Sequence, residues 1–99
     1  MRKAIVVVDM QNDFIDGALG TREAQEMLPR MVEKLTAARA EGTALIFTMD
    51  THGADYIETQ EGKRLPVEHC IRATAGWEIA PALQPFVREA AAVIEKPTF

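Results

Sequence analysis

The sequence predicts an α/β fold built on a doubly wound sheet of parallel strands. Three short apolar runs, at residues 4–8, 44–49 and 92–94, are rich in β-branched or bulky side chains. Because none of them alternates regularly with polar residues, they indicate strands that are buried on both faces, which is typical of parallel sheets. Helical segments separate the runs, so we expect right-handed βαβ crossovers between the strands.

The first expected helix lies between the first two strands. Charged residues occupy one side of it, and the other side carries apolar residues at helical spacing, namely Leu28, Met31, Val32 and Leu35. Pro29 is expected in the first turn, where its missing N–H leaves no hydrogen bond unmade. Gly42 is expected to end the helix in the left-handed conformation.

Residues 50–78 show no clear periodicity and contain several glycines together with Pro66. They predict a long loop, and loops of this length in compact domains are usually functional or disordered. A short helix is then predicted over residues 81–91, with an apolar side formed by Leu83, Phe86, Val87 and Ala90. This helix leads into the third strand and completes a second crossover.

The chain ends at Phe99, shortly after the third strand. A three-stranded parallel sheet leaves a long apolar edge unpaired, and such edges favour aggregation. We therefore expect residues 1–99 to be the N-terminal half of a single larger domain, truncated after the third strand. The alternative is a small complete domain that pairs its edges by dimerising. A homo-oligomer is expected.

The composition excludes several classes of function. With a net charge of −4 and a pI near 5.1, the chain is a poor match for nucleic acid phosphates and for anionic membrane surfaces. No apolar run approaches the roughly 18–20 residues of a membrane span, and the run after Lys3 is too short for a signal peptide. The single cysteine, Cys70, fits a reducing cytoplasm. We expect a cytoplasmic protein that handles a small molecule or another protein.

Charged residues follow each expected strand: Asp9 follows the first, Asp50 the second, and Glu95 with Lys96 the third. Because the carboxyl ends of parallel strands face one crevice, these residues are expected to converge on a ligand site. Asp9 beside Lys96 suits a carboxylate that takes a proton from a nucleophile, since the lysine keeps the carboxylate ionised. The alternative is a structural salt bridge.

Asp50, His52 and His69 form a second group of candidate residues. Residues two apart in an extended segment point the same way, so Asp50 and His52 could share one ion. His69 could supply a third ligand from the loop. Two imidazoles and a carboxylate leave positions open for water or substrate on a zinc-like or iron-like ion. The alternative is a pair of hydrogen-bonded loop histidines.

Cys70 is the only thiol and directly follows His69. Adjacent residues in an extended chain point apart, so His69 is badly placed to act as a base toward this thiol. A lone cysteine is more often a small buried apolar residue than a catalyst. We therefore expect a structural role for Cys70 and not that of a nucleophile.

Four segments resemble motifs of the isochorismatase-like cysteine hydrolases, a superfamily that includes the nicotinamidases. They are residues 4–14, 48–52, 65–71 with 74–79, and 95–99, and the resemblance spans essentially the whole chain, with the motifs in the order of the family. The resemblance implies a three-layer, Rossmann-like sheet of about six strands. It also implies catalytic roles for Asp9 and Lys96, a metal site at Asp50, His52 and His69, and a substrate-binding role for Phe14.

The activity implied by the resemblance is hydrolysis of a C–N amide bond in a small molecule through a cysteine thioester. The family nucleophile lies beyond the last motif, so the 99 residues alone are expected to be inactive. A divalent zinc, iron or manganese ion is expected, with no organic cofactor. Two alternatives are a vinyl-ether hydrolase of the isochorismatase type, with structural metal-like residues, and a non-catalytic half-domain that binds a partner.

Overall fold

The computed structural model describes residues 3–53, 58, 67 and 69–96. The elements follow one another as β1 (Ala4–Val8), α1 (Asn12–Ile15), α2 (Arg22–Ala40), β2 (Ala44–Asp50), η2 (Pro81–Leu83), α4 (Gln84–Val87) and β3 (Ala92–Lys96). Part of the expected loop over residues 50–78 lies outside the described residues. Within the described ranges, no helix is both long and apolar enough to cross a membrane.

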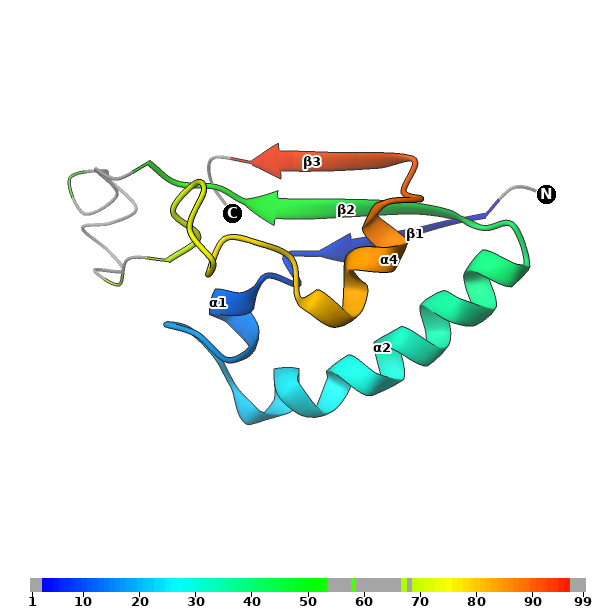
Figure 1. The fold of residues 1–99 in the computed structure, drawn as a ribbon, viewed down its shortest axis with the longest axis horizontal. Helices are drawn as coiled ribbons and strands as arrows, with labels where there is room; N and C mark the ends of the chain where they lie inside the picture. The colour runs from blue at the N-terminus through cyan, green and yellow to red at the C-terminus, as the bar shows by residue number, and fades with distance from the viewer. Residues whose placement is uncertain (1–2, 54–57, 59–66, 68, 97–99) are drawn as a thin grey trace.

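The three strands form one parallel sheet in the order β1-β2-β3, as the apolar runs predict. Ala4 of β1 pairs with Ala44 of β2, and Asp50 at the end of β2 pairs with Lys96 at the end of β3. The arrowheads of all three strands point the same way (Figure 1). The carboxyl ends of the strands therefore meet at one edge of the sheet, where the sequence places Asp9, Asp50 and Lys96.

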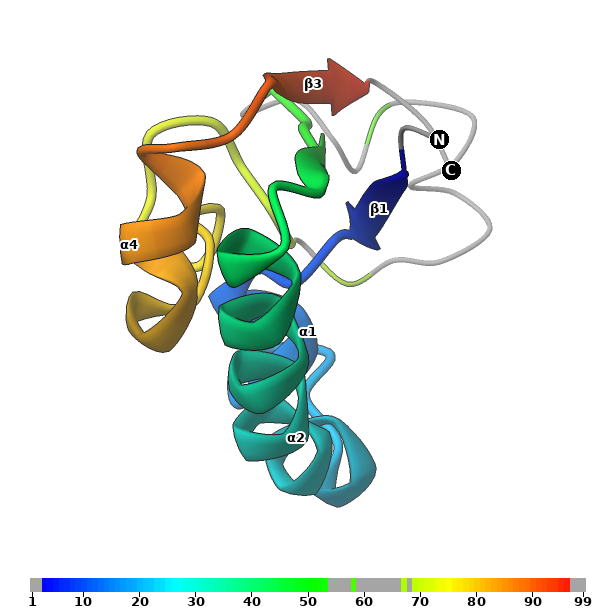
Figure 2. The ribbon, with the colours of Figure 1, turned by 90° about the vertical axis from the view of Figure 1, so that its right-hand side faces the viewer.

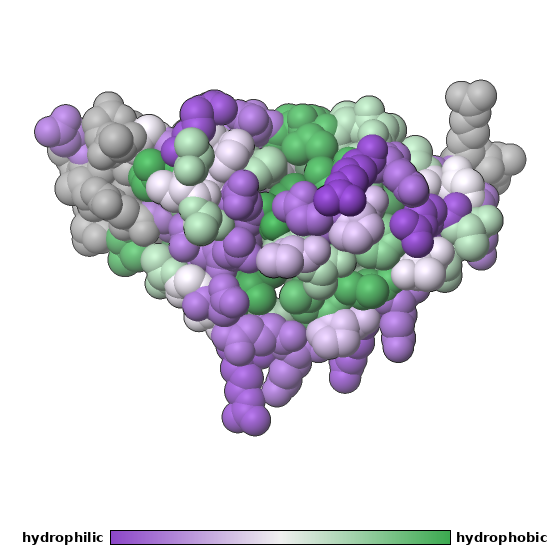
Figure 3. Space-filling view, viewed as in Figure 1, coloured by the Kyte–Doolittle hydropathy of each residue, from purple (hydrophilic) through white to green (hydrophobic). Residues whose placement is uncertain are grey.

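The described helices α2 and α4 lie on the same face of the sheet (Figures 1 and 2). Between them and the sheet lies a core that includes Val7, Leu35, Leu45, Phe47, Leu83 and Phe86. The space-filling view shows polar side chains projecting outward along the α2 side, with apolar residues gathered between them and the sheet (Figure 3). The layers of helix and sheet thus match the predicted α/β class.

The opposite face of the sheet carries apolar side chains that the described helices do not cover. Val6 and Val8 of β1 are 54% and 59% exposed, and Ile94 of β3 is 50% exposed, whereas Val7 is buried. The expectation that every strand is buried on both faces is therefore wrong for this part of the chain. An uninterrupted apolar run shows that both sides of a strand are apolar, but it does not show that a helix layer packs on each face of the sheet.

Helix α2 begins earlier than the apolar spacing predicts. The side chain of Thr21 accepts a hydrogen bond from the Ala24 N–H at 3.1 Å, so the helix starts at Arg22 and Pro29 lies in its interior. The expected first-turn position of Pro29 is wrong, because the N-cap fixes the start and the helix continues through the proline. Gly42 does adopt the predicted left-handed conformation, with φ of 76°.

The predicted helix over residues 81–91 is shorter in the structure. It consists of η2 followed by α4, which ends at Val87. The N–H groups of Glu89 and Ala90 bond three residues back, to Phe86 and Val87, which tightens the chain into a turn before β3. The strand β3 is longer than expected and extends to Lys96, and this places the lysine inside the sheet register.

Candidate active site at the carboxyl ends of the strands

Asp9 and Lys96 are brought together by the sheet although they are 87 residues apart. Asp9 directly follows β1 with a positive φ of 52°, and its N–H donates to the carbonyl of Thr48 on β2 at 3.1 Å. Lys96 closes β3, and its Nζ donates to Asp9 Oδ2 at 2.8 Å across β2. The Thr48 hydroxyl donates to the other carboxylate oxygen of Asp9 at 2.8 Å.

The Asp9–Lys96 pair is only partly buried, with side-chain exposures of 13% and 27%. Lys96 shares its side of the sheet with Ile94, which pairs with Thr48, and Thr48 pairs with the exposed Val8. The pair therefore lies toward the face that α2 and α4 leave uncovered. A carboxylate held by a lysine and a hydroxyl within reach of solvent can accept a proton from a reacting group.

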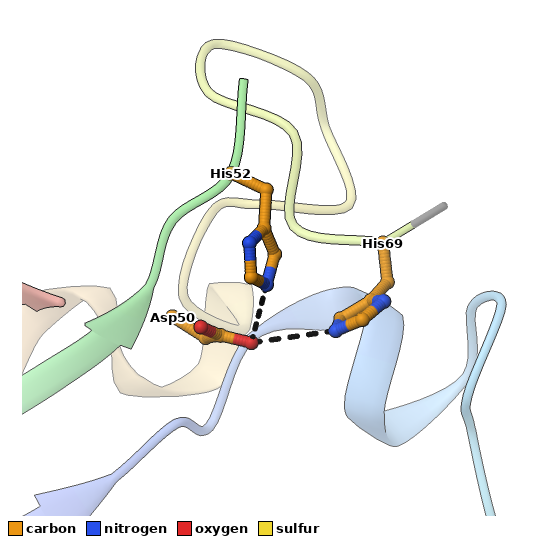
Figure 4. Close-up of side chains that lie close together, drawn as sticks. All are labelled: Asp50, His52 and His69. Atoms are coloured by element: carbon orange, nitrogen blue, oxygen red, sulfur yellow. Dashed lines mark hydrogen bonds and ion pairs between the residues drawn. The ribbon is translucent and has the colours of Figure 1, made fainter. Parts of the chain in front are cut away.

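Asp50, His52 and His69 form a cluster at the end of β2. Figure 4 shows both imidazole rings directed at the same carboxylate oxygen. The Nε2 atoms of His52 and His69 lie 3.0 Å and 3.3 Å from Asp50 Oδ2. One potential ligand atom from each residue falls within 4.8 Å of the others, and all three side chains are buried.

The hydrogen bonds of this cluster fit a cation. His69 Nδ1 lies 2.7 Å from the carbonyl oxygen of Val67, which can only accept, so Nδ1 carries a proton and Nε2 is the ring atom that could serve as a metal ligand. Asp50 Oδ1 is buried without a hydrogen-bond partner among the described residues. Two imidazoles and a carboxylate that converge in a buried space form a donor set that suits zinc or iron.

Gln11 is a site residue that the sequence analysis did not single out. Its side chain is fully buried and bonds the backbone of Asp50 on both sides: Oε1 accepts the Asp50 N–H at 2.9 Å, and Nε2 donates to the Asp50 carbonyl at 2.8 Å. Nε2 also donates to the carbonyl of Trp77 at 2.7 Å. Gln11 therefore holds the strand end that carries Asp50.

Cys70 is fully buried, and its surroundings keep the thiol protonated. Burial first, and then the negative charges of Asp50, Asp13 and Asp9, raise the pKa of Cys70 to about 12, although Lys96 acts in the opposite direction. A nucleophilic cysteine needs a lowered pKa, because the thiolate is the reactive form. The geometry supports the predicted structural role of this residue.

Phe14 lies beside the histidine cluster. Its ring meets the ring of His69 edge-on, with 5.5 Å between the ring centroids, and the rings of His52 and His69 are 4.9 Å apart. Phe14 belongs to the short helix α1, which the sequence analysis did not predict. The aromatic ring thus forms part of the wall around the cluster, and its predicted contact with substrate stays a prediction.

The two groups of residues are joined through the sheet into one site. Asp50 and Lys96 are partners in the register of β2 and β3, and the Thr51 N–H donates to the Lys96 carbonyl at 2.8 Å. Gln11, two residues after Asp9, holds Asp50 by the hydrogen bonds described above. The structure thus brings together Asp9, Asp50 and Lys96 at the strand ends, with the Asp9–Lys96 pair next to the candidate cation site in the sheet register.

Residues 3–99 match the isochorismatase domain. A search of curated proteins found no match. Among solved structures, the pyrazinamidase of Pyrococcus horikoshii in complex with zinc is 31% identical, with a TM-score of 0.77 over 100% of this chain and 54% of that chain. The nicotinamidase/pyrazinamidase of Bacillus subtilis is 30% identical, with a TM-score of 0.81 over 97% of this chain and 56% of that chain.

An N-carbamoylsarcosine amidase from Thermoplasma acidophilum is also similar. It is 30% identical, with a TM-score of 0.76 over 97% of this chain and 52% of that chain. The chain described here therefore spans about half the length of each of these similar enzymes. The match to the isochorismatase domain spans the residues of the sheet, the helices and both groups of candidate site residues.

Proposed function

The chain belongs to the isochorismatase family, and from this premise we propose that it supplies half of the active site of an amide hydrolase. The proposed substrate is a small amide, and the proposed reaction passes through a thioester on a cysteine located beyond residue 99. The observation that carries the proposal is the 2.8 Å contact between Lys96 Nζ and Asp9 Oδ2 at the carboxyl ends of β1 and β3.

Asp9 is the proposed general base and acid. It accepts the proton of the attacking thiol while the sulfur forms a bond to the amide carbonyl carbon. It then returns that proton to the nitrogen as the C–N bond breaks and ammonia leaves. Water hydrolyses the thioester, which yields the carboxylic acid and regenerates the thiol. Lys96 stabilises the negative charge that is shared between the carboxylate and the sulfur in these steps.

Asp50, His52 and His69 are the proposed ligands of a divalent cation, with zinc, iron and manganese as candidates. The buried Asp50 Oδ1 and the fixed tautomer of His69 support this assignment, and so does the zinc complex of the Pyrococcus horikoshii enzyme. A bound cation would act as a Lewis acid toward a substrate atom or a water molecule. Phe14, against the His69 ring, would contact the substrate bound there.

Release of ammonia from nicotinamide and pyrazinamide tests this proposal, using the protein as its gene encodes it. We expect the wild-type protein to release ammonia and Asp9→Asn to be slower by about 10²–10⁴-fold, because asparagine cannot take the thiol proton. Asp16→Asn is the matched control, since Asp16 is exposed at the end of α1.

Two outcomes would contradict the proposal. One is a wild-type protein that releases no ammonia from either amide, and the other is an Asp9→Asn variant as active as the wild type. Cleavage of a vinyl ether by a protein that leaves amides intact would favour an isochorismatase-type reaction in its place.

A further inference from the structure

Asp13 of α1 contacts the segment that carries His69 although the two are far apart in sequence. Asp13 Oδ2 accepts the backbone N–H of Cys70 at 2.7 Å, across 57 residues. A short hydrogen bond to a carboxylate is stronger than one between neutral groups. The residue directly after His69 is therefore fixed by a charged side chain from another element.

The backbone at Cys70 needs such support. Its φ is 48°, in the left-handed region that residues with a side chain rarely adopt. The backbone turn at Cys70 directly follows His69 and therefore affects the orientation of the His69 side chain. The carbonyl of Cys70 accepts the His52 N–H at 2.9 Å, so the residue is held from both sides, by Asp13 and by the backbone of the other histidine.

The space for the Asp13 carboxylate is provided by a glycine. A Cβ at position 76 would lie 2.3 Å from both carboxylate oxygens, so only Gly76 leaves the side chain in place. The Asp13 N–H donates to the Gly76 carbonyl at 2.9 Å, which keeps the two segments in register. The carboxylate of Asp13 therefore occupies a space that the backbone around Gly76 leaves open for it.

We propose that Asp13 is a positioning residue that holds His69 in its metal-binding orientation. Asp13 fixes the backbone after His69, the neighbouring Phe14 packs against its ring, and Val67 fixes its tautomer. Asp13 does not belong to the group that could hold the ion, so it acts through His69. This inference rests on the cation site of the proposed function.

The first measurement uses the metal-free protein, again as its gene encodes it. Hydrogen exchange at the Cys70 amide, followed by NMR, should be about tenfold faster or more in Asp13→Ala than in the wild type, because the acceptor is lost. Asp13→Asn keeps one acceptor oxygen and should exchange at an intermediate rate. Asp16→Ala, an exposed residue of the same segment, should leave the rate unchanged.

The second measurement is titration with Co²⁺, whose visible absorption reports the ligands around the ion. Asp13→Ala should bind Co²⁺ about 10–100-fold more weakly, as is typical when the support of a metal ligand is removed. Its spectrum should also change, because His69 no longer approaches from the same direction. Asp13→Asn should restore most of the affinity and the spectrum, and Asp16→Ala should match the wild type in both.

An Asp13→Ala variant with wild-type Co²⁺ affinity and spectrum would overturn the proposal. If that variant fails to fold, Gly76→Ala carries the test, since an alanine at position 76 displaces an intact carboxylate and should produce the same spectral change, and a wild-type spectrum in Gly76→Ala would then overturn the proposal. A wild-type protein that binds no Co²⁺ contradicts the cation site of the proposed function. Exchange at the Cys70 amide then decides by itself whether Asp13 holds this segment.

Discussion

The Asp9–Lys96 pair and the Asp50–His52–His69 cluster differ in how completely the protein satisfies them. Both carboxylate oxygens of Asp9 have donors, one from Lys96 and one from Thr48. In the cluster, two imidazoles share one oxygen of Asp50, and the other oxygen has no partner among the residues that the structure describes. Both carboxylate oxygens of Asp9 are therefore paired, whereas only one oxygen of Asp50 is paired within the described part of the chain.

The two groups also differ in what holds them. Asp9, Thr48 and Lys96 lie in or next to the strands, so the parallel register alone brings them together. The cluster depends on side chains from other elements: Gln11 holds the strand end at Asp50, and Asp13 holds the loop segment that follows His69. This difference indicates that the proposed proton transfer relies on the sheet itself, while the proposed cation site depends on supporting residues.

Removing the charge of Lys96 from the Asp9–Lys96 pair should produce the largest effect on activity. We expect Lys96→Met to lower the rate of ammonia release from nicotinamide by about 10²-fold or more. Without Lys96, the Asp9 carboxylate loses both the hydrogen bond that orients it and the positive charge that keeps it ionised. Lys34→Met, at an exposed position of α2, is the control. A Lys96→Met variant within a few-fold of the wild-type rate would show that the pair is only structural.

Removing a support of the cluster should mainly affect stability. Gln11→Met leaves the Asp50 N–H, the Asp50 carbonyl and the Trp77 carbonyl without their side-chain partner, so we expect the free energy of unfolding to fall by about 2–4 kcal/mol. Gln84→Met removes a single hydrogen bond to the Ile79 carbonyl and should cost about 1 kcal/mol. Equal losses in urea denaturation would contradict the supporting role of Gln11.

Substitution of Cys70 should have the smallest effect on activity and stability. We expect Cys70→Ala to leave turnover within a few-fold of the wild type and to lower the free energy of unfolding by at most about 1–2 kcal/mol. Assays of ammonia release and urea denaturation at neutral pH measure both quantities. Loss of activity by several orders of magnitude would make Cys70 the nucleophile and overturn the proposed mechanism.

The same variant has a pH dependence with a defined sign. The pKa of Cys70 is about 12 in the folded protein and near 9.0 in the unfolded chain, so the unfolded state loses its proton first as the pH rises. The thiol therefore destabilises the fold progressively from about pH 9 upward. Cys70→Ala should gain stability relative to the wild type over that range, and a constant difference would contradict the raised pKa.

The sequence predicts the sheet and the strand-end residues well because both follow from local patterns. Apolar runs mark the strands, and the charged residues after them converge wherever strands run parallel. Pro29 was misplaced because the periodic residues begin near it, whereas Thr21, seven residues before Leu28, fixes the start of α2. The apolar run of β1 indicates a strand with two apolar faces, but it does not reveal what covers each of them.

The supporting residues of the cluster could not be predicted from local patterns. Gln11 acts on backbone groups 39 and 66 residues away, and Asp13 on one 57 residues away. Both lie in the segment 4–14 that resembles a family motif, but their hydrophobic pattern and spacing do not distinguish them from polar surface residues. Only the folded backbone shows that their partners are buried and otherwise unsatisfied, which is where a missing hydrogen bond costs most.

Metal content tests the central claim most directly, namely that the cluster is completed by a cation. Mass spectrometry of the purified protein, as its gene encodes it, should find about one zinc, iron or manganese ion per chain, and His52→Ala should lose most of it because one of three ligands is gone. Asp16→Ala should keep the wild-type content. Equal metal content in the wild type and His52→Ala would contradict the account.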